Sequence, residues 1–112
     1  MRISRATMLM GLLLSMTMTS LAFAGYEKVA GGIRFVYEGD YAGSVSVAGD
    51  FNGWNGTATP MTKSGDVWSV VVSLGPGTHE YKFVVDGQWV ADPDNPTRVG
   101  DFGNSAIQIG PD

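Results

Sequence analysis

The chain has 112 residues, a formal net charge of −4 and no cysteine. The absence of cysteine excludes disulfide bonds, thiolate metal ligands and a cysteine nucleophile. An acidic chain with only seven Lys and Arg residues is also poorly suited to binding nucleic acid or an anionic membrane surface.

Residues 1–24 have the composition of a cleavable signal peptide. Two arginines give the N-terminus a positive charge, and an apolar stretch follows over residues 8–18. Ala22-Phe23-Ala24 then supplies small residues at both positions that signal peptidase recognises. Serine and threonine interrupt the apolar stretch, which disfavours the alternative of a membrane-spanning anchor. We therefore expect export to the periplasm or the extracellular space, with no membrane contact after cleavage.

Cleavage after Ala24 would leave residues 25–112, a length that suits one domain with one modest core. This part carries five basic against eleven acidic side chains, hence a formal charge of −6.

The remaining chain predicts short β-strands separated by turns. Residues 25–30 are interpreted as a lead-in, and β-branched, aromatic and alternating residues indicate the strands that follow. The segments 57–65 and 97–104 are interpreted as loops; Pro60 excludes a central strand in the first of them, where Met61 is expected to turn inward. The expected strands are Ile33–Tyr37, Ser44–Ala48, Val67–Leu74, Thr78–Val85, Gln88–Val90 and Ser105–Ile109. About six or seven such strands, without an amphipathic helix, predict an all-β sandwich.

The stretch from Gly49 to Asn55 predicts a tight, shaped turn, because Gly and Asn tolerate left-handed backbone conformations. Trp54 lies at the tip of this turn. A large aromatic residue there either folds back over the core or faces a ligand.

The dipeptide Asp86-Gly87 between two apolar runs predicts a two-residue type I′ hairpin. Val84 would then lie opposite Trp89, and side-chain alternation would place Lys82 and Trp89 together on the outer face. One interpretation of this pair is a cation–π contact that covers the sheet. The other is a flat indole that stacks on a sugar ring while the lysine donates hydrogen bonds to hydroxyl groups.

No other residues predict catalysis or a cofactor. Trp68 is expected in the core, and His79 lacks catalytic partners, so a structural role beside a turn is expected. Asp92, Asp94 and Asp101 lack the spacing of a calcium loop and are better explained as turn residues near prolines. No two carboxylates are placed for glycoside hydrolysis. We expect no cofactor, no metal and no enzymatic activity.

Several motifs resemble one known family. They are Val45–Trp54, Met61, Trp68, Gly77–Trp89, Asp92-Pro93 and Asn104-Ser105. Together they are similar to the family 48 carbohydrate-binding modules, which include the glycogen-binding domain of AMP-activated protein kinase β-subunits and the early-set domains of isoamylases and branching enzymes. The resemblance covers most of residues 33–109 and implies an immunoglobulin-like β-sandwich.

The resemblance also implies a binding site for α-1,4-glucan, namely glycogen, starch or a maltooligosaccharide. Trp54 and Trp89 would stack on the sugar, Lys82 and Asn104 would donate hydrogen bonds, and Phe102 would pack against it. Such modules usually accompany a catalytic or kinase-docking domain, so a partner enzyme or self-association is expected to raise avidity. The alternative is an exported immunoglobulin-like module that contacts or regulates protein and no longer binds sugar.

Overall fold

The computed structural model describes residues 25–39 and 41–111, so the expected signal peptide lies outside the described residues. This part forms nine strands and one 3-10 turn, η2. Their bounds are β1 Tyr26–Val29, β2 Gly32–Glu38, β3 Val45–Gly49, η2 Asp50–Asn52, β4 Thr62–Ser64, β5 Val67–Val72, β6 Gly77–Val85, β7 Gln88–Val90, β8 Arg98–Val99 and β9 Asn104–Ile109. Among these residues, no helix is long and apolar enough to cross a membrane.

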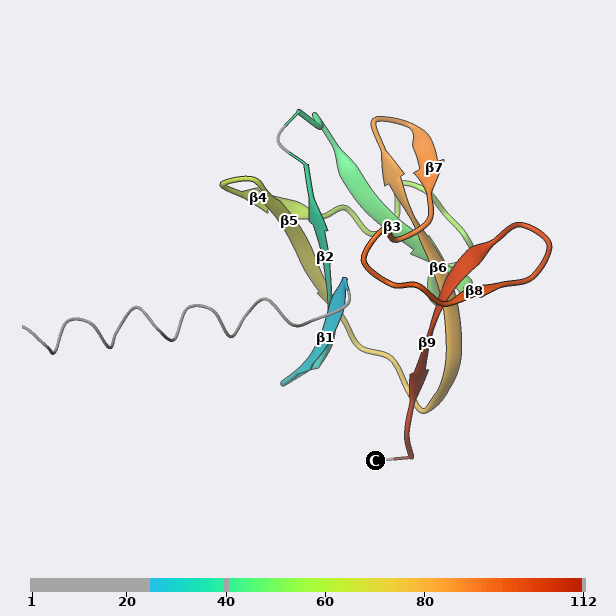
Figure 1. Ribbon diagram of the computed structural model, residues 1–112. Helices are drawn as coiled ribbons and strands as arrows, with labels where there is room; N and C mark the ends of the chain where they lie inside the picture. The colour runs from blue at the N-terminus through green and yellow to red at the C-terminus, as the bar shows by residue number, and fades with distance from the viewer. Residues whose placement is uncertain (1–24, 40, 112) are drawn as a thin grey trace, which may run out of the picture.

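The strands form two antiparallel sheets (Figure 1). The first has the order β1-β2-β5-β4, and the second has the order β3-β6-β9-β8, with β7 also paired to β6. The prediction of an all-β fold is confirmed, and the two sheets are arranged as in a β-sandwich.

Three strands lie in segments that were predicted to be a lead-in or loops. The predictions for 25–30, 57–65 and 97–104 are wrong where β1, β4 and β8 form. All three are short strands at the ends of the two sheets. Each has a single paired neighbour and little buried surface, so it carries no strong alternation of apolar and polar residues.

The core lies between the sheets and is built mainly by β2, β3, β5, β6 and β9. The rings of Phe35 from the first sheet and Tyr81 from the second meet with centroids 4.7 Å apart. Met61 and Trp68 are buried, as predicted. The full cluster is Ile33, Phe35, Val45, Val47, Met61, Trp68, Tyr81, Phe83 and Ile107.

The hairpin of β6 and β7 has the predicted register and turn. Val84 pairs with Trp89, and Val85 pairs with Gln88. Both turn residues have positive φ, 50° at Asp86 and 86° at Gly87, as a type I′ turn requires.

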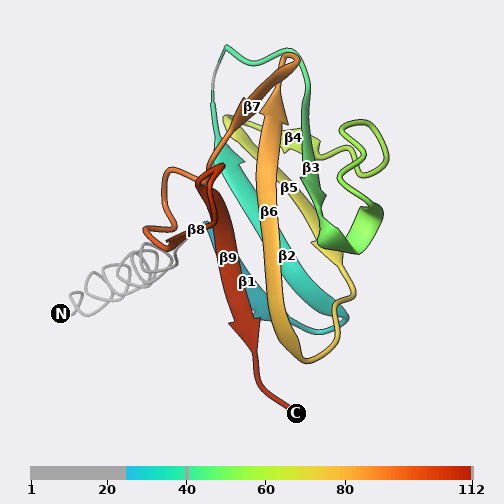
Figure 2. The ribbon, with the colours of Figure 1, turned by 90° about the vertical axis from the view of Figure 1, so that its right-hand side faces the viewer.

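One edge of β6 is shared between two partners. β9 pairs with its first half, Gly77–Tyr81, and β7 pairs with its last three residues, while β3 lies along the opposite edge. Figure 2 shows β9 beside the lower part of β6 and β7 beside the upper part. Lys82 lies between the part of β6 that pairs with β9 and the part that pairs with β7.

Candidate functional site

The outer face of the second sheet has a hollow of about 470 Å³ at this junction. Its lining brings together all five residues that were predicted to bind carbohydrate, together with Glu80, which was not predicted. The lining residues are Trp54, Glu80, Lys82, Trp89, Phe102 and Asn104. They come from the turn after β3 and from β6, β7, the β8–β9 loop and β9.

Strand alternation explains the residues from β6 and β7. Tyr81 and Phe83 are fully buried, so Glu80 and Lys82, which alternate with them, point outward. Trp89 is paired with Val84 on the same outer face, and its side chain stays 48% exposed. The same alternation would have identified Glu80 from the sequence, two residues before Lys82.

The turn that carries Trp54 is tight, as predicted. Gly53 and Trp54 both have left-handed backbones, with φ of 70° and 59°. Trp54 N donates to the Gly49 carbonyl (2.8 Å), and the Asn52 amide accepts from Gly49 N and donates to Val47 O (3.0 and 3.1 Å). These bonds close the turn, so the half-buried indole of Trp54 is held at the edge of the hollow.

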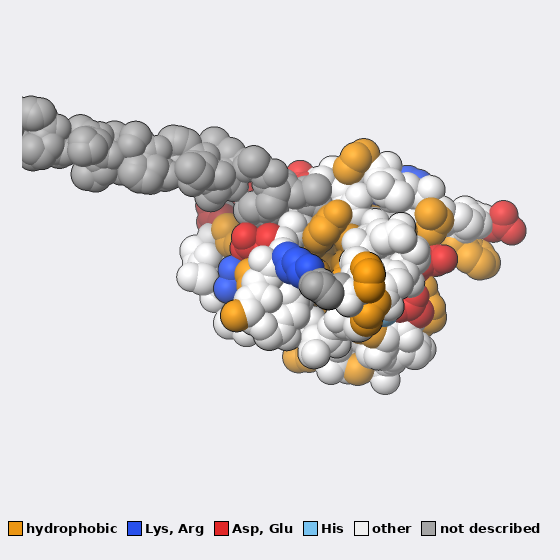
Figure 3. All heavy atoms as spheres, turned by 90° about the horizontal axis from the view of Figure 1, so that it is seen from below, with side chains coloured by type: hydrophobic (Ala, Val, Ile, Leu, Met, Phe, Trp, Pro, Cys, Tyr) orange, Lys and Arg blue, Asp and Glu red, His pale blue; other side chains and the backbone are white. Residues whose placement is uncertain are grey.

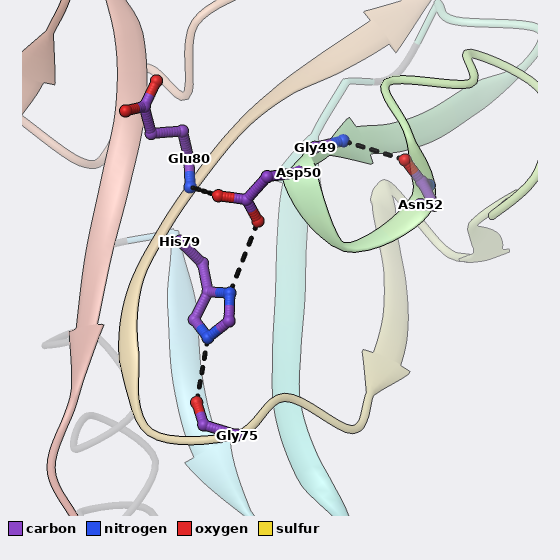
Figure 4. A network of polar contacts seen from close by, with 6 residues as sticks. All are labelled: Gly49, Asp50, Asn52, Gly75, His79 and Glu80. Atoms are coloured by element: carbon purple, nitrogen blue, oxygen red, sulfur yellow. Dashed lines mark hydrogen bonds and ion pairs between the residues drawn. The ribbon is translucent and has the colours of Figure 1, made fainter.

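Asp50 ties this turn to β6 (Figure 4). Its Oδ2 accepts from Glu80 N at 2.9 Å, and its Oδ1 lies 3.4 Å from His79 Nδ1. The other ring nitrogen of His79 lies 2.8 Å from the Gly75 carbonyl, so the imidazole bridges η2 and the turn before β6. The histidine thus has the predicted structural contacts, and the two sides of the hollow are fixed relative to each other.

Replacing Asp50 with alanine is expected to lower the free energy of unfolding by about 1 kcal/mol, because the Glu80 amide loses its acceptor at a partly exposed site. Asp50→Asn is the matched control, since its amide oxygen can still accept that bond. Urea denaturation of both variants measures the difference. Equal losses in the two variants would show that the bond to Glu80 N does not matter.

Lys82 contacts the loop between β8 and β9 rather than forming the cation–π pair considered above. Its Nζ donates to the Phe102 carbonyl at 2.7 Å. A cation–π contact is present elsewhere, between Lys63 Nζ and the Trp68 ring at 5.9 Å. The ammonium of Lys82 therefore fastens the loop to the floor of the hollow.

That loop projects from the body of the molecule (Figure 1). Gly100 and Gly103 have positive φ, and Gly103 N donates to Gly100 O at 3.2 Å, so the loop closes on itself. Figure 3 shows hydrophobic and acidic side chains at the outer end of the projection. Phe102 is 81% exposed at this position, which leaves its ring free to contact a ligand above the hollow.

Asn104 is oriented by Glu80. Its Nδ2 donates to Glu80 Oε1 at 3.0 Å, at a partly buried position. The carboxylate accepts hydrogen bonds, whereas the amide and the Lys82 ammonium donate them. The hollow therefore combines aromatic surface with both kinds of hydrogen-bonding group.

Comparison with known proteins identifies the family of this chain. Residues 32–109 match the family described as the glycogen recognition site of AMP-activated protein kinase. The chain is 42% identical over 67 residues to the 5'-AMP-activated protein kinase subunit beta-2 of Mus musculus, covering 58% of this chain and 24% of the relative. It is 39% identical over 67 residues to subunit beta-1 of Sus scrofa, covering 58% of this chain and 53% of the relative. The matched region thus spans between a quarter and about half of these relatives. The chain belongs to the family of glycogen recognition sites of AMP-activated protein kinase, a group of family 48 carbohydrate-binding modules, as the resemblance implied.

Proposed function

We propose that the protein binds α-1,4-glucan through the hollow on β6, β7 and β9, and that it does not catalyse a reaction on the glucan. The observation that carries this proposal is the convergence of two indole rings with Lys82 and Asn104 in one hollow. Sites for small ligands are mostly apolar, with a few polar groups that fix orientation. The C–H face of a pyranose ring can stack on an indole while its hydroxyls meet the polar groups. Phe102 supplies a further ring above the hollow.

The lining of the hollow favours binding over hydrolysis. Glycoside hydrolysis generally uses two carboxyl groups on either side of the bond that breaks. Glu80 is the single carboxylate among the six lining residues, and its Oε1 already accepts a hydrogen bond from Asn104.

The proposed ligand is glycogen, starch or a maltooligosaccharide, and the proposed scaffold is an immunoglobulin-like early-set sandwich. The family description supports glycogen as one of these ligands. The composition of residues 1–24 supports export to the periplasm or the extracellular space.

One observation favours a protein contact as the second candidate function. Phe102 exposes 81% of its surface at the end of a projecting loop, a position suited to a partner enzyme or a second copy of the chain. In that case the same face would bind protein and no longer bind sugar.

The test is isothermal titration of the protein without residues 1–24, using maltoheptaose as ligand and the β-1,4-linked cellohexaose as control. Saturable heat with maltoheptaose alone is expected. A folded protein that gives no heat with maltoheptaose would contradict glucan binding. Concentration-dependent sedimentation in the same sample would then support the protein contact.

A further inference from the structure

A buried carboxylate lies beneath the strands that carry the hollow. Asp92 follows β7 and is completely buried. Tyr81 Oη donates to its Oδ2 at 2.6 Å, Asp94 N donates to its Oδ1 at 2.9 Å, and its own N–H donates to Ser105 Oγ at 2.8 Å. The carboxylate thus has two hydrogen-bond donors, and the side chain and main chain of Asp92 together connect β6, β9 and the segment after β7.

No cation contacts this carboxylate among the described residues. Arg98, the nearest basic residue in the sequence, directs its guanidinium at main-chain carbonyls, including that of Asp92 at 3.0 Å. The ion pairs in this part of the chain join Arg34 to Glu27 and His79 to Asp50. Burial raises the pKa of Asp92, because a carboxylate removed from water without a cation is unfavourable.

Gly25 lies directly against Asp92. A Cβ atom at Gly25 would be 2.2 Å from Asp92 Oδ2 and 2.3 Å from Oδ1, and the residue is buried with φ of +84°. Its carbonyl accepts from Val36 N at 2.9 Å, which fixes it beside β2. Covalent geometry then places the Gly25 nitrogen within about 5 Å of both carboxylate oxygens.

From this contact we infer that Asp92 is the binding site for the α-ammonium of Gly25, formed when the chain is cleaved after Ala24. This inference rests on the proposed export. Peptidase-catalysed hydrolysis adds water across the Ala24–Gly25 amide bond, leaving a carboxylate on Ala24 and an ammonium on Gly25. Before cleavage the same nitrogen is a neutral amide, so no cation in the described part of the chain is in direct contact with the buried charge of Asp92, and Arg98 acts on it only from beyond contact distance. After cleavage the two charges pair at the end of β1.

The contact also explains why the residue after the cleavage site is glycine. Any side chain would overlap the Asp92 carboxylate, and the positive φ disfavours L-residues as well. A processed chain that began with alanine would carry the same ammonium but could not bring it to Asp92.

The test compares four proteins that span the same core: one that begins at Gly25 with a free amine, the same chain N-acetylated, one that begins at Ala24, and one with Gly25→Ala at its start. The core residues lie between 33 and 107, so each is expected to fold. At pH 7 the free-amine Gly25 protein is expected to melt about 4–8 °C higher than the other three. In an Asp92→Asn background the free-amine and acetylated proteins should melt together. Equal melting temperatures in the Asp92 background would overturn the inference.

The pH dependence gives a second readout. An ion pair raises the folded-state pKa of the α-amine, so its stabilisation is complete below the ordinary value of about 8 and is lost as the pH rises above it. Without the ammonium, the raised pKa of Asp92 has a consequence of the same sign at lower pH: stability falls as the pH rises from the ordinary carboxyl range through the raised value. Tyr81, Asp94 and Arg98 also face Asp92, and Tyr26 acts on Tyr81. These groups are the same in both proteins, so the difference between the free-amine and acetylated forms isolates the amine. A difference that persisted above pH 10 would contradict the ion pair.

Two further measurements separate this inference from the proposed function. Titration with maltoheptaose reports on the hollow, so loss of sugar binding with the melting difference intact would contradict only glucan recognition. Intact-mass analysis of exported protein reports on processing. A mature chain that begins anywhere other than Gly25 would overturn the inference.

Discussion

Replacing Trp89 with alanine is expected to abolish retention of the protein on amylose while leaving it folded. The indole is 48% exposed and lies beside Lys82 in the hollow, so its loss removes stacking surface and opens no core cavity. Truncation of a central aromatic contact commonly weakens binding by 2 kcal/mol or more, which corresponds to at least about 30-fold in the dissociation constant. Affinity electrophoresis through amylose and calorimetric titration with maltoheptaose measure this loss. Trp54→Ala is expected to act in the same direction, and the double variant should show no binding.

The control for this prediction is Tyr41→Ala. Tyr41 is 97% exposed but does not line the hollow, so this change removes an aromatic ring without touching the proposed site. Its affinity for maltoheptaose should equal that of the unmodified protein. Retained binding by Trp89→Ala, or equal losses in the Tyr41 and Trp89 variants, would place the glucan elsewhere.

Replacing Phe35 with alanine is expected to cause the largest loss of stability, about 3–5 kcal/mol. Phe35 is completely buried and contacts the rings of Tyr81 and Phe51, with centroid separations of 4.7 and 5.8 Å. The loss approaches the whole free energy of unfolding of a small domain. Because Phe51 belongs to η2, the cavity also lies under the turn that carries Trp54, so glucan binding should weaken before the protein unfolds.

Urea denaturation followed by tryptophan fluorescence measures this effect. Phe35→Leu is the matched control, since it keeps an apolar side chain and leaves a smaller cavity; its loss should be roughly half as large or less. A Phe35→Ala midpoint no lower than that of Phe35→Leu would contradict the role of the ring contacts.

The parts of the fold that follow from local pattern could be predicted from the sequence. Asp86-Gly87 determines a turn, the turn determines the register, and the register places Val84 opposite Trp89. The edge strands β1, β4 and β8 were not predicted, although each pairs with the next strand along the chain, because each is short, has no fully buried residue and shows no alternation of apolar and polar residues.

In the candidate site, too, the features that follow from local pattern could be predicted and the others could not. Side-chain alternation and family motifs bring five of its residues together in advance, and alternation would also have indicated Glu80. The contacts among these residues could not be predicted, because they depend on where loops that are distant in the sequence meet in the fold. The bond from Lys82 to the Phe102 carbonyl, and the contact of Gly25 with Asp92, join positions that no local rule connects.

If the protein binds glucan as proposed, the ends of its two sheets affect how closely bound copies can pack along the polymer. Many copies bound along one glucan chain would be crowded together, and exposed strand edges would then promote pairing between copies and aggregation. The outer edge of β3 is covered by its own chain, since Val47 N donates to Thr59 O, Met61 N donates to Val45 O, and Pro60 bridges Ser46. β1, β4 and β8, at the other ends, are four, three and two residues long. These edges offer little for a neighbouring copy to extend, so copies bound side by side on a glucan would remain separate.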